Sequence, residues 1–566
     1  MLEKILKNNC FKIFALIMSF MFCILFLYTS CKILKIQHCL NLVYVASVVF
    51  PLGIYFIFFD DSKKNRIICS LVFSFLVLII PFLFSWTYDY TADGNSYHKM
   101  AIGFMKEGWN PIYESSLDWQ INKDVIQIDP VTNINKWIDH YPKATWTMGA
   151  TMYSYTGSIE SGKSINFLLM VSAGLLLYSF FSTKFSKKIS LLFSLLLIIN
   201  PVLLSQMFSY YLDGLMGICF TIEFILLVLL DVCDKKSWLL WFLLLCDCSI
   251  FVNLKFTGLL YSGITAAVFY FYWLFKDKKN FWKIFKYITI RFSALFIIAT
   301  CFIGLNSYVR NTIDHHNPLY PLIGKDKVDI ITTMQPKVFG EINSIQKFTW
   351  SLFSKTENIT YFSGDPNIKF PFMLYNKEIH TIYESPDIRI AGFGPFYAAS
   401  FIIGLVFLIY GIVVLIRNKN RVLKYFVMAL ISIIACCIAV KECWWARYIP
   451  QFYCIPVMGL IILEYLFKGK KKCILQIILS LVLFANICCF LCTYPYRFRD
   501  FTKTRSDLVE LSNMEKVNLD FDVHNLPFGV YFNLKDYKVK FNLITIDEDE
   551  PVRWFYSWKV RVKLDD

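Results

Sequence analysis

Charged residues are scarce in this sequence. They make up 17% of the 566 residues, whereas hydrophobic residues make up 57% and the mean hydropathy is +0.50. An ordinary soluble domain is about one quarter charged and about half apolar. The core of a water-soluble fold of this length cannot bury so much apolar surface, but a lipid bilayer can surround it. The composition therefore excludes an ordinary soluble protein and predicts an integral membrane protein.

Several common sequence signals are also missing. The 18 cysteines fall mostly within apolar runs and form no pair of CxxC units, and the adjacent His315 and His316 alone do not make a zinc ligand set. The apolar run 14–28 is too long for the core of a signal peptide and lacks a small-residue cleavage site, so we expect it to be the first span. We find no internal repeat of fixed period and no low-complexity linker.

Apolar runs long enough to cross a bilayer recur along the chain. A transmembrane helix needs about 20 apolar residues to cross about 30 Å of hydrocarbon. This rule predicts an all-α bundle of about thirteen spans, at residues 13–31, 40–59, 67–86, 164–183, 188–207, 210–230, 237–254, 256–275, 287–306, 395–416, 424–440, 446–467 and 473–493.

The basic residues predict the orientation of these spans. With the N-terminus inside, the cytoplasmic loops hold 23 Lys and Arg residues and the short outer loops hold 5. A bias of this size is the positive-inside signal. We therefore expect a cytoplasmic N-terminus, an outside C-terminus and a location in the plasma (inner) membrane. The net charge of +15 lies in these short clusters and not on one basic face, which argues against nucleic-acid binding.

Three long polar segments then fall on the outer side. Two are loops, at about 87–163 and 307–394, within a transmembrane domain of residues 1–493. The third is the tail, residues 494–566, which we expect to form a small extracytoplasmic domain. Alternation of apolar and polar residues predicts strands in the tail at 529–534, 537–541 and 554–564.

The first outer loop begins with two carboxylates close to the membrane surface. Asp89 and Asp93 are one helical turn apart, and His98 follows five residues after Asp93. A carboxylate at this boundary lies in a reduced dielectric, which favours a raised pKa and a role as a general base. The plainer interpretation is a helix end with ordinary polar residues, in which Asp93 and Gly94 form a turn.

Ionisable residues also lie within or at the ends of the predicted spans. Asp213 is at the outer end of one span, and Asp247 and Lys255 are about two turns apart on another. Charges within a membrane are costly and usually face a bundle interior or a cavity. They are either part of a functional site or a structural pair, for example of Lys255 with one of the two aspartates.

Two arginines are predicted on the same outer face. Arg310 leaves the helix that precedes the second long loop, and Arg447 lies at the start of the span 446–467. Together with Lys255, they would face Asp93 across the outer boundary of the membrane. Cations opposite a carboxylate suit an anionic lipid headgroup and a nucleophile that must lose a proton.

With these residues the sequence resembles the GT-C superfamily of membrane glycosyltransferases, in particular the enzymes that use polyprenyl-phosphate-linked sugars, such as protein O-mannosyltransferases and the lipid A aminoarabinose transferase. The resemblance covers the spans and both long outer loops. The locally matching segments are 93–98 (Asp-Gly-Asn-Ser-Tyr-His), 140–143 (His-Tyr-Pro-Lys), 253–257 (Asn-Leu-Lys-Phe-Thr), Arg310-Asn311 with 317–321 (Asn-Pro-Leu-Tyr-Pro), and 446–448 (Ala-Arg-Tyr).

The resemblance implies a GT-C-like fold and an inverting transfer from a polyprenyl-phosphate-linked sugar to a hydroxyl of a glycan, lipid or protein acceptor on the outer face. Asp93 would be the general base, with Asp89 second. The implied substrate-binding residues are His98 and Lys143, which would orient donor or acceptor, Lys255, Arg310 and Arg447, which would bind the phosphate, and Tyr320. Asp89 and Asp93 depart from the tight Asp-x-Asp of many members, so the sequence assigns no cofactor and leaves a divalent metal open.

Other functions stay open at this point. One is a polysaccharide polymerase or ligase that moves a whole glycan from a lipid diphosphate. Another is a transporter or flippase, although transporters usually show internal repeats and polar site residues near the middle of the membrane. A structural membrane scaffold would leave the isolated charges at the outer helix ends without an explanation.

Overall fold

The chain is mostly helical, as expected of a multi-pass integral membrane protein. A computed structural model describes residues 2–58, 61–119, 134–325, 327–329, 331–466, 470–521, 527–547, 550–556 and 560–563. Within these ranges, nine helical segments are long and apolar enough to cross a membrane. They are α2 (Asn9–Ile33), α3 (Leu40–Phe58), α4 (Lys63–Phe84), α9 (Ser164–Phe181), α12 (Asp213–Val232), α14 (Phe256–Lys276), α15 (Phe281–Phe296) continued by η5 (Ile297–Ile303), α19 (Tyr397–Arg417) and α22 (Lys470–Leu491).

The other four predicted spans are shorter or interrupted. α13 (Trp238–Leu254), α20 (Leu423–Ala439) and α21 (Cys454–Leu466), with the turn η9 (Pro450–Tyr453) before it, are apolar but shorter. The predicted span 188–207 is not one helix but two, α10 (Lys187–Ile198) and α11 (Pro201–Gln206). Pro201 has no N–H to continue a helix, and the Asn200 side chain caps α11 by accepting from the Val202 amide at 2.9 Å.

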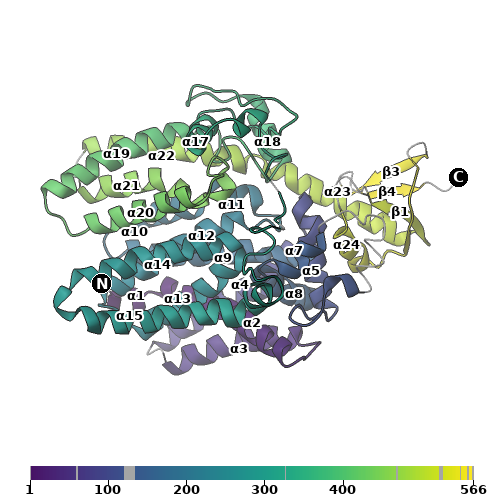
Figure 1. Cartoon of the computed structure of the whole chain (residues 1–566), viewed down its shortest axis with the longest axis horizontal. Coiled ribbons are helices and arrows are strands. Elements are labelled where there is room, and N and C mark those ends of the chain that lie inside the picture. Colours follow the sequence, from purple (N-terminus) through teal and green to yellow (C-terminus); the bar gives the residue numbers. More distant parts are fainter. Residues whose placement is uncertain are drawn as a thin grey trace.

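The helices pack in layers that follow the sequence. In Figure 1, α2 and α3 lie at the bottom, α12 to α15 in the middle, and α19 to α22 at the top. The upper layer is held by close contact between α19 and α21, where a Cβ added to Gly459 would lie 2.4 Å from the carbonyl oxygen of Gly404. Only glycine allows this approach, as is common between membrane helices.

The two ends of α2 contact different polar segments. Near its start, Lys12 pairs with Asp61 at 2.5 Å, in the loop between α3 and α4. At its other end, Lys32 donates to the carbonyl oxygen of Gly108, in the first long loop, at 3.4 Å. The two loops that were predicted to lie on opposite sides of the membrane are thus separated by the length of this helix. The sidedness itself stays a prediction.

The two long loops are partly helical. The first contains η1 (Gly94–His98), α5 (Lys99–Lys106), η2 (Ser116–Asp118), α7 (Ile134–His140), α8 (Ala144–Thr156) and η3 (Ile159–Lys163). The second begins with η6 (Leu305–Arg310) and continues through α16 (Asn311–His315), η7 (Lys337–Gly340), α17 (Ser344–Leu352) and α18 (Asn376–Glu384). The turn η8 (Ala446–Tyr448) lies between α20 and η9. Two further short elements, α1 (Leu2–Leu6) and η4 (Lys278–Asn280), lie where the sequence predicts cytoplasmic segments.

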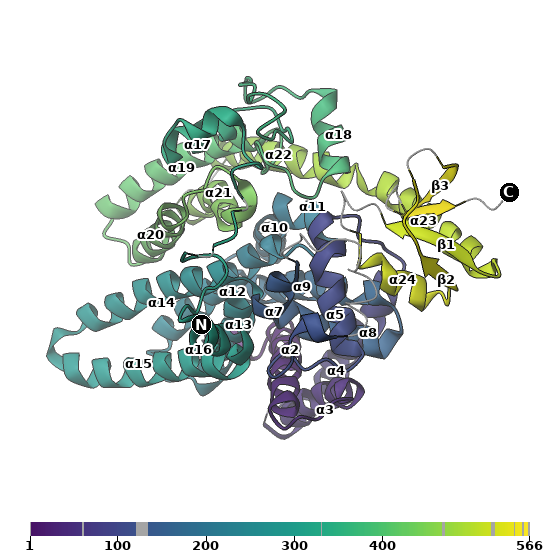
Figure 2. The same ribbon diagram turned by 45° about the vertical axis from the view of Figure 1, so that its right-hand side comes forward.

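The tail combines helices with a small sheet. It contains α23 (Tyr494–Asn513), β1 (Val517–Phe521), α24 (Val530–Asp536), β2 (Phe541–Leu543), β3 (Val552–Phe555) and β4 (Val560–Lys563). The strand order is β2-β1-β4-β3, with β1 and β2 parallel and the other pairs antiparallel. Figure 2 shows this unit beside α5 and α8, at the end of the helical bundle.

The predicted β content of the tail is confirmed, but its strands are placed differently. The segment predicted as a strand at 529–534 is wrong, since it forms most of α24, and 537–541 is a turn that reaches a strand only at Phe541. The predicted strand 554–564 corresponds to parts of two antiparallel strands, β3 and β4, and its residues 557–559 and Leu564 lie outside the described residues. Helix α24 is buried on several sides, so the alternation of apolar residues could not distinguish helix from strand.

Candidate functional site

Arg447 is the centre of a cluster of acidic side chains from distant parts of the chain. Its Nε lies 2.9 Å from Asp213 at the start of α12, and its Nη1 lies 2.8 Å from Asp387, which follows α18. Its Nη2 is 3.7 Å from Asp93, which immediately precedes η1. The guanidinium therefore draws together the first loop, the second loop and a membrane helix through one planar group.

Lys255 supplies a second cation to the cluster. It lies in the break between α13 and α14, and its Nζ is 2.7 Å from the other carboxylate oxygen of Asp213. The same ammonium group lies 4.7 Å from the centre of the Tyr448 ring, and the Arg447 guanidinium lies 4.6 Å from the Tyr211 ring. Asp213 is 2% exposed and is thus neutralised by two cations inside the protein.

Asp93 is the most accessible acid of the cluster. Its side chain is 35% exposed, compared with 15% for Asp387. Enclosure by the surrounding protein raises the pKa of the Asp93 carboxyl above its ordinary value, and the Arg447 guanidinium opposes this by favouring the charged form. A carboxyl group that is reachable and has a raised pKa is a stronger base than an ordinary carboxylate and is suited to accept a proton from a substrate.

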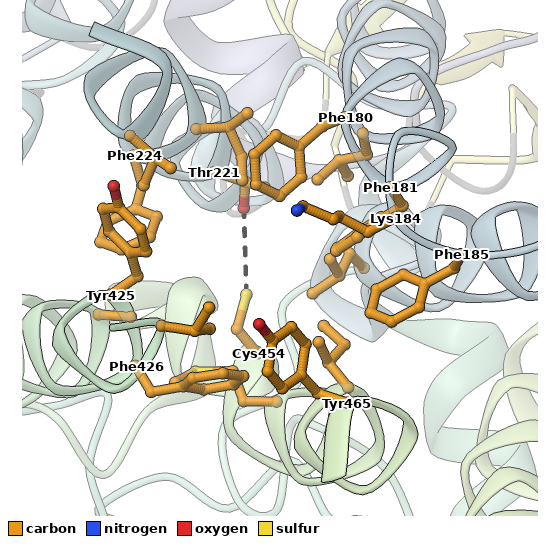
Figure 3. Close-up of a pocket in the computed structure, with 18 of the residues that line it drawn as sticks. Phe180, Phe181, Lys184, Phe185, Thr221, Phe224, Tyr425, Phe426, Cys454 and Tyr465 are labelled. Carbon is orange, nitrogen blue, oxygen red and sulfur yellow. Dashed lines mark hydrogen bonds between the residues drawn. The ribbon is translucent and has the colours of Figure 1, made fainter. Parts of the chain in front are cut away.

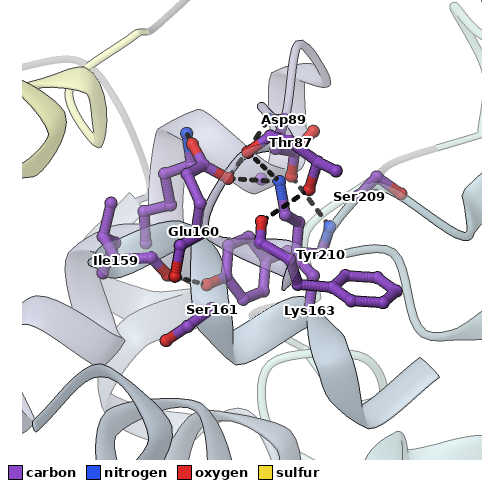
Figure 4. A network of polar contacts seen from close by, with 12 residues as sticks. Thr87, Asp89, Ile159, Glu160, Ser161, Lys163, Ser209 and Tyr210 are labelled. Carbon is purple, nitrogen blue, oxygen red and sulfur yellow. Dashed lines mark hydrogen bonds and ion pairs between the residues drawn. The ribbon is translucent and has the colours of Figure 1, made fainter. Parts of the chain in front are cut away.

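Asp89 has a different environment from Asp93. It is fully buried, and its two oxygens accept hydrogen bonds from the Thr91 and Tyr210 amides, each at 2.8 Å. Figure 4 shows that it lies beside the buried Glu160. Both Asp89 oxygens are thus engaged with backbone donors, which is the geometry of a structural carboxylate.

Glu160 organises a buried network that the sequence analysis missed. It pairs with Lys99 at 2.5 Å and with Lys163, and all three side chains are at most 1% exposed. From the tail, Asn533 donates to Glu160 at 2.9 Å and the Tyr556 hydroxyl at 3.0 Å. The network therefore fixes the tail to the first loop, next to Asp89. One feature of the sequence could have indicated this network: two charged residues, Glu160 and Lys163, lie directly before an apolar run.

His98 and Lys143 both contact the side chain of Trp146. Trp146 Nε1 donates to His98 Nδ1 at 2.6 Å, and the Lys143 Nζ lies 5.2 Å from the centre of the Trp146 ring. Burial lowers the pKa of the His98 imidazole to about 3 and that of the Lys143 ammonium to about 7. His98 is therefore neutral, and because its Nδ1 accepts, its Nε2 carries the proton and can donate.

Arg310 and Tyr320 belong to a separate group of contacts. The Arg310 side chain is 40% exposed, pairs with Asp314 at 3.0 Å and donates to the Ile112 carbonyl oxygen. The Tyr320 ring stacks on His315 at 3.7 Å between ring centres. Within the described ranges, no ion pair or hydrogen bond joins Arg310 to the Arg447 cluster. The sequence analysis placed Lys255, Arg310 and Arg447 together. In the structure, only Lys255 and Arg447 share a partner, Asp213.

The contacts of Arg310 predict that it supports the structure. An Arg310→Ala variant is expected to lose the hydrogen bond to Ile112 and to be destabilised by about 1–2 kcal/mol, since a hydrogen bond from a charged group contributes about that much. Its melting temperature in detergent should fall, while its affinity for polyprenyl phosphate stays within about twofold of the unchanged protein. If the Arg310→Ala variant had a normal melting temperature but lost its affinity for polyprenyl phosphate, Arg310 would instead be a phosphate-binding residue.

Asp387 is the residue of the cluster that sequence reasoning did not find. It follows Ser385 and Pro386 in an irregular segment, 60 positions before Arg447. Its partner Arg389 lies 3.8 Å away. No local pattern marks such a residue, because its importance depends on where the second loop returns to the bundle. Within the described ranges, no group of three His, Cys, Asp or Glu side chains could hold a metal ion.

An apolar cavity lies apart from these polar residues. It is enclosed by α9 and α12 on one side and by α20 and α21 on the other, and includes Phe181, Phe224, Phe426 and Met458. Figure 3 shows the Lys184 ammonium directed into it, near the contact between Thr221 and Cys454. Its lining suits hydrocarbon chains and offers little to a sugar.

No model of a known protein family matches the sequence, and no curated protein matches it.

Proposed function

We propose that the protein is a membrane glycosyltransferase of the GT-C type. It transfers a sugar from a polyprenyl-phosphate-linked donor to a hydroxyl group of a glycan, lipid or protein acceptor, with inversion at the anomeric carbon. The active site faces the outer side of the plasma membrane, where the positive-inside rule places the two long loops.

One observation carries this proposal: the reachable Asp93 carboxylate lies beside the least occupied edge of Arg447. Arg447 Nε and Nη1 are within 2.9 Å of carboxylates, whereas Nη2 lies 3.7 Å from Asp93, beyond hydrogen-bond distance. Nη2 can therefore donate to an incoming phosphate oxygen while the other two contacts hold the guanidinium in place. A base and an anion-binding group side by side are what glycosyl transfer from a phosphate requires.

The chemical step assigns one role to each group. The acceptor oxygen attacks the anomeric carbon, and its proton passes to Asp93. The bond between the anomeric carbon and the phosphate oxygen breaks, and the phosphate leaves with the electron pair. Arg447 and Lys255 stabilise the charge that develops on the phosphate, as fixed cations do in other transfer reactions. Asp213 keeps both cations in position, and Arg310 has no part in this step.

His98 and Lys143 are assigned to substrate orientation. The neutral His98 presents an N–H group that can donate to a sugar hydroxyl, and Trp146 fixes its ring through Nδ1. Lys143 Nζ is held by the carbonyl oxygens of Asp139 and Tyr141 at 2.9 and 2.8 Å. Holding two substrates in register can lower the barrier by several kcal/mol, of order 7–11 in favourable cases.

Binding of the leaving group tests the assignment of Arg447. Arg447→Lys is expected to weaken binding of polyprenyl phosphate about tenfold, because lysine keeps the charge but cannot contact Asp213, Asp387 and a phosphate with one planar group. Affinity can be measured by thermophoresis of the purified protein in detergent with polyprenyl phosphate as the probe.

The matched control is Arg553→Lys, the same substitution at an arginine that pairs with Glu510 at 2.5 Å in the tail. Its affinity for polyprenyl phosphate should be unchanged. Equal affinity of the Arg447→Lys variant would contradict the phosphate role. Much tighter binding of polyprenyl diphosphate than of the monophosphate would favour the polymerase or ligase.

A transporter is the second candidate, and two buried acids favour it. Glu223 in α12 and Asp247 in α13 are fully buried and make no ion pair among the residues that the structure describes. Unpaired carboxyls inside a membrane protein often belong to proton or cation pathways. Release of polyprenyl phosphate from a sugar donor, measured in sealed proteoliposomes without an ion gradient, distinguishes the transferase from an ion-coupled transporter.

A further inference from the structure

A segment of the second long loop exposes large apolar side chains outside the membrane-spanning helices. We call the following eight residues the aromatic patch: Tyr361, Phe362, Ile368, Phe370, Phe372, Met373, Leu374 and Tyr375. Phe362 is 83% exposed and Phe370 is 62% exposed. Such a concentration of exposed large apolar side chains in one folded segment is typical of an interaction site.

The same segment buries one ion pair, although Asp365 and Lys377 are exposed. Lys369 and Glu378 pair at 2.5 Å, and their side chains are 2% and 1% exposed. Glu378 also accepts hydrogen bonds from the Thr356 amide at 2.8 Å and the Tyr375 amide at 2.9 Å. The loop is thus ordered, with its ion pair inside and its aromatic rings outside. This arrangement is unfavourable in water and favourable where the surroundings are hydrocarbon.

The segment is held by further backbone contacts. The Trp350 indole donates to the Pro366 carbonyl oxygen at 3.0 Å, and the Lys355 amide donates to Asn367 at 2.8 Å. The Lys369 amide donates to Phe353 at 2.9 Å. These bonds leave the rings of the aromatic patch facing outward, so their exposure follows from the fold of the loop.

The loop lies on the flank of the helical bundle. Helix α18 packs against α22 and α23. Figures 1 and 2 both place α17 and α18 beside α19 and α22, while α5 and the tail lie at the end of the bundle. The outward side of α22 is itself apolar, with Leu481 62% and Phe484 59% exposed. The aromatic patch therefore lies next to a surface that meets lipid in a membrane protein.

We infer that the aromatic patch inserts into the outer leaflet of the membrane and anchors the second loop there. The partner is lipid at the boundary between headgroups and acyl chains, where aromatic side chains are enriched. Two lysines fit this position: Lys355, whose ammonium lies 4.3 Å from the Tyr375 ring centre, and the exposed Lys377. Lysines beside inserted rings reach toward lipid phosphates. This inference does not depend on the proposed glycosyl transfer.

The anchor has a structural consequence for the site. Asp387 lies on the chain directly after α18 and contacts Arg447 at 2.8 Å. The segment from the aromatic patch through α18 to Asp387 therefore connects the lipid surface with the Arg447 cluster.

Photo-crosslinking in membranes tests the insertion. Benzoylphenylalanine is introduced at Phe372, 51% exposed, in the full-length protein, which is then irradiated in phospholipid vesicles. We use the same substitution at Phe484 in α22 as the lipid-facing control and at Glu515, exposed in the tail, as the water-facing control. Position 372 should yield phospholipid adducts, detected by mass, within about twofold of position 484 and at least about fivefold above position 515.

Two outcomes overturn the inference. An adduct yield at 372 no higher than at 515 would mean that the aromatic patch faces water. Crosslinks from 372 to a second copy of the chain, in place of lipid, would mean that the patch is a protein interface. If the variant at Phe372 does not fold, the probe at Phe362 gives the same comparison, because that side chain is the most exposed of the patch.

Discussion

An Asp93→Asn variant is expected to lose about 10²–10⁴-fold of its turnover, the usual effect of removing a general base. The fold should be kept, because the Asp93 side chain is 35% exposed and its ion contact with Arg447 is 3.7 Å long. Turnover is measured in proteoliposomes from a panel of polyprenyl-phosphate-linked sugars, and the melting temperature is measured on the same preparations. Near-normal turnover in the well-folded variant would refute the role of Asp93.

The pH dependence adds a second readout. A base must be deprotonated, so activity should fall as the pH drops through the pKa of Asp93, which burial raises above the ordinary carboxyl value. In the Asp93→Asn variant, the residual rate should no longer fall as the pH drops through this range. The matched control is Asp314→Asn, since Asp314 is a similarly exposed aspartate that pairs with Arg310. Its rate and pH profile should match those of the unchanged protein.

A Glu160→Gln variant is expected to lose about 3–5 kcal/mol of stability, the cost of breaking a buried ion pair on one side. The substitution keeps the shape of the side chain but leaves Lys99 and Lys163 as buried cations that are 0% exposed. Because Asn533 and Tyr556 also bind Glu160, the tail should detach from the first loop. Thermal unfolding reports the first effect and limited proteolysis near α24 the second.

Glu3→Gln is the matched control for this prediction. Glu3 also pairs with a lysine, Lys7 at 2.7 Å, but its side chain is 81% exposed. An ion pair that is exposed to solvent on both sides contributes little to stability, so the control should unfold as the unchanged protein does. An intact tail and an unchanged melting temperature in Glu160→Gln would show that the network is not required for stability.

The membrane helices were predictable because a helix that crosses the hydrocarbon core needs about 20 mostly apolar residues. Helices are present at all thirteen predicted positions, and nine of them meet the full length for a span. The clearest departure is the break at Asn200 and Pro201. A hydropathy average over a window hardly changes with a single proline. The proline nevertheless ends the helix locally, because it has no N–H group to continue the helical hydrogen bonds.

The tail was less predictable because tertiary contacts determine it. Helix α24 presents Asn533 to Glu160, and a Cβ added to Gly103 in the first loop would lie 2.1 Å from the Phe532 ring. Such contacts with a remote segment override the local preference of a short apolar run. Helix α23 was not expected at all, since its polar sequence was read as the start of the tail domain.

The candidate site was predicted in part. Asp93, Lys255 and Arg447 come together as the charge pattern at the outer helix ends indicated. The pair of Lys255 with Asp213 is one of the two structural pairs that the sequence left open. The contacts of Arg447 with Asp213 and with Asp387 of the second loop were not predicted. Arg310 shows the limit of the pattern, because a charge at a predicted outer helix end can still bind other partners, here Asp314 and the Ile112 carbonyl oxygen.

The sequence separation within these clusters affects how the protein is made. Asp213 and Arg447 are 234 positions apart, and Lys99 and Tyr556 are 457 positions apart. The chain is synthesised from its N-terminus, so the first loop leaves the ribosome long before its partners in the tail do. A chain that stops before residue 533 has its spans, but its Lys99 lacks Asn533 and Tyr556 and keeps only Asn95 and Glu160 as hydrogen-bond partners. The buried network around Lys99 can therefore form in full only after the ribosome has added Asn533 and Tyr556, the last partners to be synthesised.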